Sequence, residues 1–375
     1  RPYIPAKKGV HDVDETTDSY DTIDWLINNI PHNNGRVGVK GISYPGFYTT
    51  MATIDAHPAV KATSPQAPVS AWMLGDDFNH NGALLLPHAF DFFMAFGWPR
   101  PEPTQNDFRQ FDHGTPDGYE FYLRLGALPN ANARYAHDSV AFWNDMVHHG
   151  TYDDFWKERN VLDHVRNIRP ATMVVGGWFD TENLYGALHL YGQIERDNPD
   201  NHNMLVMGPW SHGAWRADDL DSLGDIKFGM NLSNYYAEQL EVPFFDYYLR
   251  GKGDGTGAEA TVFLTGANEW KRLGHWPPGN VQATTLYVHE HGKLSFGAPD
   301  HPKSEYDEYV SDPSRPVPYT HEITNWYHPA FMLEDQRFAS RRPDVLVYQT
   351  EVLDQALTVA GPITVHLEAS TSGTD

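Results

Sequence analysis

Three residue types that together perform nucleophilic catalysis follow strand-like segments of this sequence. Ser43 lies in GISYPG, after the run VGVK and before a helix-like segment. Asp180 ends the segment PATMVVGGWFD, and His212 lies near the end of HNMLVMGPWSHG. A serine hydroxyl is a poor nucleophile at its own pKa, so it needs a base and an acid that orients the base. The order serine, acid, histidine at strand ends therefore predicts a triad of Ser43, Asp180 and His212.

The turn that carries Ser43 is expected to be sharp. Its sequence matches G-x-S-x-x-G rather than the strict G-x-S-x-G of nucleophile elbows, and because Gly-rich strand ends are common the motif alone is a weak signal. A serine at the tip of a strand needs a strained backbone, and Gly41 and Gly46 remove side chains that would collide there. The N–H of Tyr44, in the first turn of the following helix, is the expected oxyanion-hole donor.

The other two triad residues also have ordinary structural interpretations. Asp180 could be the N-cap of a helix predicted over 183–196, and His212 could be a plain loop residue, since the chain has 20 histidines. Each alternative competes well when it is taken alone. The chain order and the matching strand ends favour the triad, because open parallel sheets place their sites at the carboxyl ends of strands.

Helix and strand signals alternate around these residues. Residues 14–30 predict an amphipathic helix with acids in its first turns, and 47–56 predict a second helix. Buried strands are expected before Ser43, at AVKATSPQAP, and before Asp180 and His212, and a closing helix is expected over 232–251. This alternation predicts an α/β fold with a parallel sheet.

Two regions depart from that alternation. Residues 79–168 are rich in Phe, Tyr and Trp with helical spacing and many breaks, which predicts a mostly helical insertion. After the Gly-rich stretch 251–260, the strand-like segments ATVFLTG, ATTLYVHE, DVLVYQTE and ITVHLEAS are separated by Pro, Gly and Asp turns. They predict a separate all-β domain with a sandwich architecture.

Composition restricts the partners of the protein. A length of 375 residues with 40% hydrophobic residues predicts two or three domains. The net charge of −23 and the pI near 5.1 argue against nucleic acid or an anionic membrane as a partner. No stretch approaches the roughly 20 apolar residues that span a bilayer. The absence of cysteine excludes disulfides, thiol nucleophiles and cysteine metal sites, and we expect no cofactor.

The motifs GxSYxG, GGWFD and GPWSHG resemble those of a serine hydrolase superfamily. It comprises X-prolyl dipeptidyl peptidases, bacterial cocaine esterase, glutaryl cephalosporanate acylases and alpha-amino-acid ester hydrolases. DTIDWLINN, WMLGDDF and PFFDYYL most resemble the alpha-amino-acid ester hydrolase branch. By this resemblance Ser43 is the nucleophile, Asp180 the orienting acid and His212 the base. The resemblance covers essentially the whole chain. It implies an α/β-hydrolase core in two parts, residues 1–78 and 169–255, with a helical cap at 79–168 between them. An incomplete jelly roll is implied at 256–375.

The same branch holds the α-ammonium group of its substrates with a cluster of carboxylates. The resemblance places two members of that cluster at Asp77 and Glu182, but the position after the glutamate, an aspartate in the family, is Asn183 here. Two carboxylates and an amide oxygen can still bind an ammonium group, although with weaker electrostatic attraction. Without the resemblance, Asp77 would be interpreted as a loop-capping residue and Glu182 as an acid in the first turn of a helix.

The resemblance implies a serine hydrolase or acyltransferase that cleaves esters or amides of α-amino acids through an acyl-enzyme. An X-prolyl dipeptidyl peptidase, a cephalosporin acylase or a general esterase is the alternative within the superfamily. The expected partner is a small ester or amide with a free α-amino group, and a homo-oligomer is left open. The resemblance also implies a periplasmic or secreted location, with the cytoplasm as the alternative.

The family's core begins with strands that supply a tyrosine hydroxyl to the oxyanion hole. This sequence starts just before the helix that precedes the nucleophile strand, and its last residues, HLEASTSGTD, stop partway through the expected jelly roll. We therefore expect the sequence to be a portion of a longer enzyme.

Two further classes of function remain as alternatives. His148 and His149 adjoin Asp145 and Asp153, but neighbouring histidines rarely chelate together and no H-E-x-x-H motif occurs, so a catalytic metal is not expected. A non-catalytic carbohydrate-binding protein would use exposed aromatic side chains of the β domain, for which the candidates are Trp270, Trp276 and Trp326.

Overall fold

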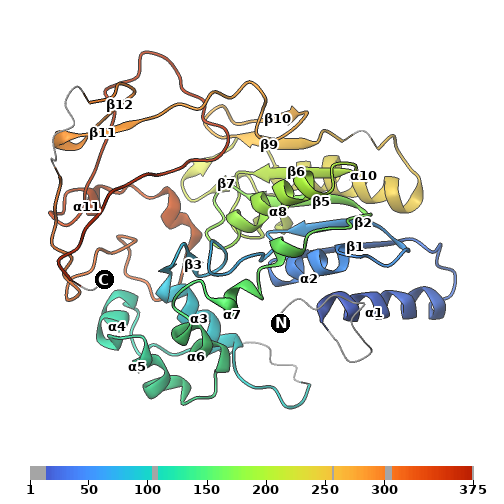
Figure 1. Cartoon of the computed structure of the whole chain (residues 1–375), viewed down its shortest axis with the longest axis horizontal. Coiled ribbons are helices and arrows are strands. Elements are labelled where there is room, and N and C mark those ends of the chain that lie inside the picture. The colour runs from blue at the N-terminus through green and yellow to red at the C-terminus, as the bar shows by residue number, and fades with distance from the viewer. Residues whose placement is uncertain (1–13, 104–108, 256, 300–305, 374–375) are drawn as a thin grey trace.

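The computed structural model describes residues 14–103, 109–255, 257–299 and 306–373. Its centre is a six-stranded sheet in the order β1-β2-β5-β6-β9-β10 (Figure 1). The first five strands run parallel, and β10 is antiparallel to β9. The strands are β1 (Val37–Ile42), β2 (Val60–Gln66), β5 (Ala171–Gly177), β6 (Asn203–Gly208), β9 (Ala260–Leu264) and β10 (Glu269–Leu273).

Both faces of this sheet are covered, as the alternation of side chains along its central strands requires. Val174 and Leu205 belong to a cluster with residues of α2 (Tyr44–Thr53) and α8 (Leu184–Asp197). Met173 and Val206 belong to a second cluster with residues of the segment 228–245. The α/β class predicted from the sequence is therefore confirmed.

The helices of the core begin and end where their local chemistry requires. Asp14 caps α1 (Glu15–Asn29) by accepting hydrogen bonds from the N–H groups of Thr16 and Thr17. The predicted closing helix over 232–251 is instead divided into α9 (Leu232–Tyr236), a π-turn η4 (Ala237–Glu241), α10 (Val242–Phe245) and a π-turn η5 (Asp246–Arg250). Pro243 has no N–H to donate, so an unbroken α-helical ladder cannot run through this segment.

The insertion between β2 and β5 is mostly helical, as expected, and has its own core. Phe90, Phe93 and Trp143 are buried there among further aromatic side chains. Its elements are the hairpin β3 (Asn79–His80) and β4 (Ala83–Leu84), the helices α3 (Leu86–Phe96), α4 (Gly118–Leu125), α5 (Pro129–Ala131), α6 (Ala141–His148) and α7 (Asp154–Lys157), and the turns η1 (Asn132–Ala136) and η2 (Val161–His164). Figure 1 shows these helices below the sheet, and we call them the cap.

One prediction for the C-terminal part is wrong. The segment ATVFLTG was assigned to the separate all-β domain, whereas β9 pairs with β6 and β10 completes the core sheet. Val262 and Phe263 of β9 are buried on opposite faces of the sheet. An apolar strand that is buried on both faces fits the interior of a sheet. The Gly-rich stretch before this strand was interpreted as a linker between domains, which led to the wrong prediction.

The remaining C-terminal residues contain fewer strands than their sequence predicts. β11 (Tyr287–His289) and β12 (Lys293–Ser295) form a two-stranded sheet, and Lys293 bridges to Gln349. DVLVYQTE and ITVHLEAS are not strands, and Val352 and Ile363 are 95% and 80% exposed. Within the described residues no neighbouring sheet buries these side chains, so a strand gains nothing there. The jelly roll and the other expected domain boundaries stay predictions, whereas the core sheet extends past the expected boundary at residue 255.

The other short elements complete the described structure. They are η3 (Ala214–Arg216), β7 (Ser222–Leu223), β8 (Ile226–Lys227), η6 (Glu290–Gly292), η7 (Pro329–Leu333) and α11 (Arg337–Ser340). Among the described helices, none combines the length and the apolar character needed to cross a membrane.

Replacement of Phe263 tests the place of β9 in the core. Phe263→Ala leaves a cavity between the sheet and the segment 228–245, so we expect the free energy of unfolding in urea to fall by about 3–5 kcal/mol. Val288→Ala in β11, at a side chain that is 45% exposed, is the control and should cost much less. Equal losses for the two variants would contradict this position of β9.

Candidate active site

Ser43 lies at a sharp turn between β1 and α2. Its backbone has φ 68° and ψ −125°, which is strained for a residue with a side chain. The Ser43 N–H donates to Gln66 O at 2.9 Å, and Phe47 N donates to Ser43 O at 3.0 Å. A Cβ on Gly41 would lie 2.3 Å from Pro45 O, and one on Gly46 would lie 2.4 Å from Gln66 O. The backbone approaches itself so closely here that only glycine fits on both sides.

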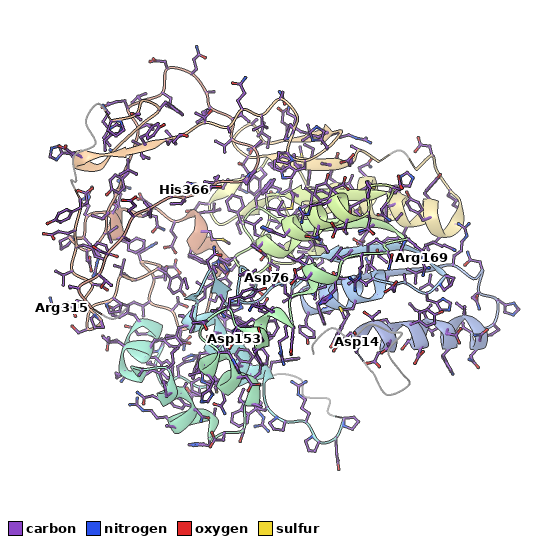
Figure 2. All side chains as sticks on the ribbon, viewed as in Figure 1. Asp14, Asp76, Asp153, Arg169, Arg315 and His366 are labelled. Atoms are coloured by element: carbon purple, nitrogen blue, oxygen red, sulfur yellow. The ribbon has the colours of Figure 1, made fainter. Side chains whose placement is uncertain are left out.

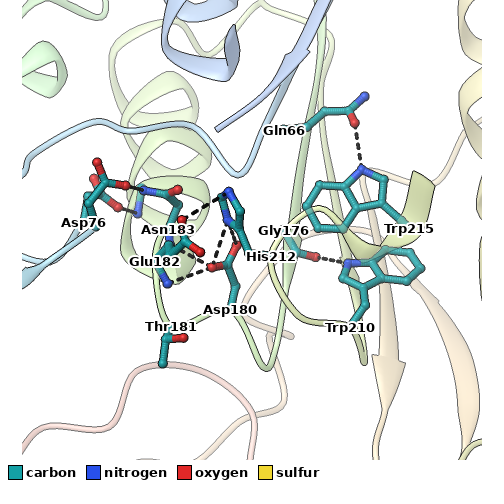
Figure 3. Close-up of polar contacts among 12 residues, drawn as sticks. Gln66, Asp76, Gly176, Asp180, Thr181, Glu182, Asn183, Trp210, His212 and Trp215 are labelled. Atoms are coloured by element: carbon teal, nitrogen blue, oxygen red, sulfur yellow. Dashed lines mark hydrogen bonds and ion pairs between the residues drawn. The ribbon is translucent and has the colours of Figure 1, made fainter. Parts of the chain in front are cut away.

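Asp180 and His212 follow the neighbouring strands β5 and β6 and are hydrogen-bonded to each other (Figure 3). His212 Nδ1 lies 3.0 Å from Asp180 Oδ2 and 3.2 Å from Oδ1. Asp180 Oδ1 also accepts hydrogen bonds from the N–H groups of Glu182 and Asn183, and the aspartate side chain is fully buried. These donors fix the carboxylate, which in turn orients the imidazole.

Two indole groups hold the loop that carries His212. Trp210 Nε1 donates to Gly176 O at 2.8 Å, and Trp215 Nε1 donates to the side chain of Gln66 at 2.7 Å (Figure 3). Both tryptophans are buried and pack against each other. The GPWSHG loop is therefore attached to the ends of β2 and β5 on both sides of the histidine.

Ser43 and His212 are not hydrogen-bonded to each other. Within the described part of the chain, Ser43 Oγ has no hydrogen-bond partner, whereas His212 Nε2 lies 3.4 Å from Glu182 Oε2. Both residues belong to loops at the carboxyl ends of the strands. Ser43 follows β1 and His212 follows β6, and the strands β2 and β5 lie between these two. The aspartate–histidine pair is thus formed, and the bond that would complete a triad is not.

The residues predicted for an ammonium cluster do come together. Asn183 Nδ2 donates to Asp77 Oδ1 at 3.0 Å, and Asp77 N donates to Glu182 O at 2.7 Å. Burial, reinforced by neighbouring carboxylates, raises the pKa values of Asp77 and Glu182 to about 7. Asn183 is fully buried and its Oδ1 has no partner among the described residues. The cluster therefore has more acceptors than donors.

His212 is the strongest base near this cluster. Burial by itself lowers the pKa of His212, but the charge and hydrogen bond of Asp180, with Glu182 and Asp77, raise it overall to about 9. The imidazole is therefore held in its protonated form at neutral pH in the free site.

Three residues at this site were not identified from the sequence. Asp76 is fully buried and accepts N–H groups of Ser70, Ala71 and Gly186, so it ties the loop after β2 to α8. Figure 2 shows it between the sheet and the cap. Its position beside Asp77 in LGDDF was the available signal.

The other two come from distant parts of the chain. His88 of α3 has its Nε2 3.8 Å from Glu182 Oε2, and burial lowers its pKa to about 4. Tyr327 packs edge-on against the His88 ring at 5.0 Å, and its hydroxyl is hydrogen-bonded to that of Thr181. Nothing in the local sequence of either residue indicates a site, because only the fold brings them together.

The C-terminal segment that carries Tyr327 is attached to the cap. Gly118 N donates to Thr324 O at 3.0 Å, and Asn325 Nδ2 donates to Thr115 O at 2.8 Å. The wall of the site around Glu182 thus combines the loop after β5, the cap helix α3 and the segment 324–327.

The remaining predicted residues lie as follows. Tyr44 is the first residue of α2, so its N–H belongs to the turn that follows the serine, and its ring packs against Trp72. Trp72 contacts Phe142 of the cap at 4.7 Å, which joins the aromatic core of the cap to the region of Ser43. Most cap aromatics pack among themselves, as Phe90 and Trp143 do.

The residues of the alternative functions are arranged differently. Trp270 and Trp276 are partly buried against the core, where they pack on Tyr235 and Trp178, so they are not exposed platforms for a sugar. Only Trp326 of the three is exposed. His149 is hydrogen-bonded to Asp153, and no group of three or more metal-ligating side chains occurs in the part of the chain that the structure describes.

The parallel sheet, the cap inserted after β2 and the strained serine turn define an α/β hydrolase. Residues 7–214 match the family model of X-Pro dipeptidyl-peptidase (S15 family), and residues 243–375 match that of its C-terminal non-catalytic domain. The chain therefore belongs to the X-Pro dipeptidyl-peptidase S15 family of hydrolases, within the superfamily that the sequence motifs indicated.

Three relatives illustrate the similarity. Cocaine esterase from Rhodococcus sp. (strain MB1 Bresler) is 25% identical over 97% of this chain and 64% of its own length. An alpha-amino acid ester hydrolase structure has a TM-score of 0.85 and 32% identity, over 96% of this chain and 60% of that one. An aminopeptidase from a marine sediment Thaumarchaeota archaeon has a TM-score of 0.83 and 35% identity, over 93% and 57%. This chain thus spans about three fifths of the length of these relatives.

The close approach at Gly46 gives a test of the turn. Gly46→Ala places a methyl group 2.4 Å from Gln66 O, so we expect a loss of about 1–3 kcal/mol of unfolding free energy together with reduced reactivity of Ser43. Gly192→Ala is the matched control, because nothing lies within 4 Å of that position in α8. Alanine in a helix interior should stabilise the protein there by about 0.5–1 kcal/mol. Urea unfolding of both variants makes the comparison, and a neutral effect of Gly46→Ala would contradict the geometry.

Proposed function

We propose that this chain carries the acyl-transfer site of a serine hydrolase that cleaves esters or amides of α-amino acids through an acyl-enzyme. The observation that carries the proposal is the Asp180–His212 pair, located at the same sheet edge as the strained Ser43 and beside the carboxylates Asp77 and Glu182. Membership of the S15 family supports the hydrolytic class.

The reaction would proceed in two steps. Ser43 Oγ attacks the carbonyl carbon while its proton passes to His212 Nε2, and the Tyr44 N–H stabilises the developing oxyanion. Collapse of the tetrahedral intermediate expels the alcohol or amine, which takes the proton from His212. A water or an amine then attacks the acyl-enzyme, with His212 again as the base, and releases Ser43. Asp180 holds Nδ1 protonated and stabilises the imidazolium that forms in each step.

The acid cluster supports a substrate with a free α-ammonium group. Burial raises the pKa values of Asp77 and Glu182, and the charges of neighbouring carboxylates raise them further. A bound ammonium group would supply the missing positive charge and three N–H donors, and the buried Oδ1 of Asn183 is an acceptor without a partner among the described residues. The same group occurs at the N-terminus of a peptide.

An aminopeptidase or X-prolyl dipeptidyl peptidase is therefore the second candidate, favoured by the family and by the archaeal aminopeptidase relative. The cluster alone does not separate the two, because both kinds of substrate present an ammonium group. Rates on a phenylglycine ester and on an Xaa-Pro p-nitroanilide would separate them.

Substitution of Ser43 and of Asp180 tests their catalytic roles. Ser43→Ala should abolish ester hydrolysis, and Asp180→Asn should lower kcat by roughly 10⁴-fold, because an amide leaves the imidazole in the wrong tautomer. Stopped-flow or steady-state assays of ester cleavage measure both effects, and labelling of Ser43 by a fluorophosphonate identifies the nucleophile. Full activity of Ser43→Ala would refute the proposal.

Specificity is tested by comparing phenylglycine methyl ester with its des-amino analogue, phenylacetic acid methyl ester. We expect a higher kcat/KM for the amino ester in the wild type and loss of that preference in Glu182→Gln, which keeps the shape but removes the charge. Loss of one charge-assisted bond corresponds to about 1.5–3 kcal/mol, or roughly 10–100-fold in kcat/KM. Equal rates on the two esters would leave a general esterase or acylase.

A further inference from the structure

The imidazole of His212 lies between two carboxylates. Asp180 accepts from Nδ1 at 3.0 Å, and Glu182 Oε2 lies 3.4 Å from Nε2. Nε2 is the atom that must receive the proton of Ser43 in the proposed reaction. In the free protein this nitrogen faces Glu182, and Ser43 Oγ has no hydrogen-bond partner in the described residues.

We propose that Glu182 holds Nε2 of His212 in the free enzyme and that a cationic group of the substrate, by pairing with Glu182, releases this nitrogen to act as the base for Ser43. The inference rests on the proposed function and adds that the substrate's own charge activates the site. Glu182 then has two roles, since the same carboxylate blocks the base and recognises the group that frees it.

The charges around His212 favour this exchange. The loop after β5 contributes Asp180 and Glu182, and the loop after β2 contributes Asp77. His88 of α3 and His80 of β3 also face the cluster, and burial lowers the pKa of each below its usual value, so they add no charge at neutral pH. Tyr327 is neutral as well, because burial raises its pKa. Protonated His212 is therefore the cation that these carboxylates share.

An ammonium group that binds at Glu182 changes the protonation equilibrium of His212 in two ways. It occupies the carboxylate that faces Nε2, and its positive charge disfavours a second cation beside it. Both effects lower the pKa of His212 from about 9, by roughly one to two units for a like charge at such short range. Because the pKa of His212 is raised, the imidazole is protonated, and unable to act as a base, at every pH well below that pKa. The lower value therefore makes neutral imidazole available at lower pH, but only when the substrate carries the charge.

His88 limits the alternative positions of Glu182. Its Nε2 lies 3.8 Å from the same Oε2 atom, and its ring packs against Tyr327. The cap side of the carboxylate is therefore occupied by side chains, and Asn183 is committed to Asp77. Glu182 has His212 as its one cationic neighbour among the described residues, so it returns there when no substrate is bound.

The first experiment measures the state of the base without a substrate charge. An uncharged fluorophosphonate labels Ser43 at a rate that follows the neutral fraction of His212, so the rate should rise with pH toward a midpoint near 9 in the wild type. In Glu182→Gln the midpoint should fall, and labelling at pH 7 should be faster by roughly tenfold for each unit of pKa lost. Glu158→Gln removes an exposed charge at the end of α7 that is not among the groups acting on His212, so this variant should behave as the wild type.

A second variant changes the net charge of the cluster in the opposite direction. Asn183→Asp adds a carboxylate to the cluster, so the pKa of His212 should rise and labelling at pH 7 should slow. Opposite shifts in Glu182→Gln and Asn183→Asp cannot both result from loss of folded protein. Labelling at pH 7 that is no faster in Glu182→Gln than in the wild type, while Ser43 still reacts, would overturn the inference.

The second experiment uses the substrate charge itself. The acid limb of the kcat–pH profile should lie at lower pH for phenylglycine methyl ester than for phenylacetic acid methyl ester, and the difference should vanish in Glu182→Gln. Coincident limbs in the wild type would overturn the switch and leave the proposed hydrolase intact, provided that turnover still requires Ser43. Failure of Ser43 to react with the phosphonate and with both esters would overturn the proposed function and the switch together.

Discussion

Gln66 joins the two loops on which the candidate chemistry depends. Its backbone oxygen accepts the N–H of Ser43, its side-chain oxygen accepts the indole N–H of Trp215, and its amide group donates to Glu241. The parallel register makes this possible, because Ile42 pairs with Gln66 and Gln66 pairs with Val175 at one edge of the sheet. A slip of one residue would turn these side chains to the opposite face. The buried Gln66 side chain therefore connects the histidine loop directly to the turn that carries the serine.

The shortage of cations is the second constraint on the site. Asp76, Asp77, Asp180 and Glu182 lie close together in a protein whose net charge is already −23. Backbone N–H groups satisfy Asp76, which ties the loop after β2 to α8, and they satisfy part of Asp180, which also binds His212. Asp77 and Glu182 keep carboxylate oxygens that can still accept hydrogen bonds. Among the described residues, protonated His212 is the one charged donor in the cluster for them. This imbalance connects recognition of a positive group with the protonation of the base.

Much of this arrangement could be predicted from the sequence, because strand ends and glycine spacing are local signals. Ser43, Asp180 and His212 are predicted in this way as a triad, of which the structure brings the aspartate and the histidine together. The contributions of His88 and Tyr327 could not be predicted, since they depend on how the cap and the C-terminal segment pack. The assignment of β9 failed for a related reason, because a strand's sequence indicates that it is buried but not which sheet buries it. The contact between Nε2 and Glu182 is likewise a property of the folded site alone.

The attachment of residues 324–325 to the cap at Thr115 and Gly118 has a consequence for the wall of the site. Once Thr324 and Asn325 are bound to the cap, the Tyr327 hydroxyl meets Thr181 as an intramolecular partner at high effective concentration. Three weak contacts in a closed loop then reinforce one another, so the loss of any one lowers the occupancy of the other two. The side chains around Glu182 are therefore positioned by contacts within one chain that reinforce one another, and a segment with little regular structure contributes to a site that the regular core supports.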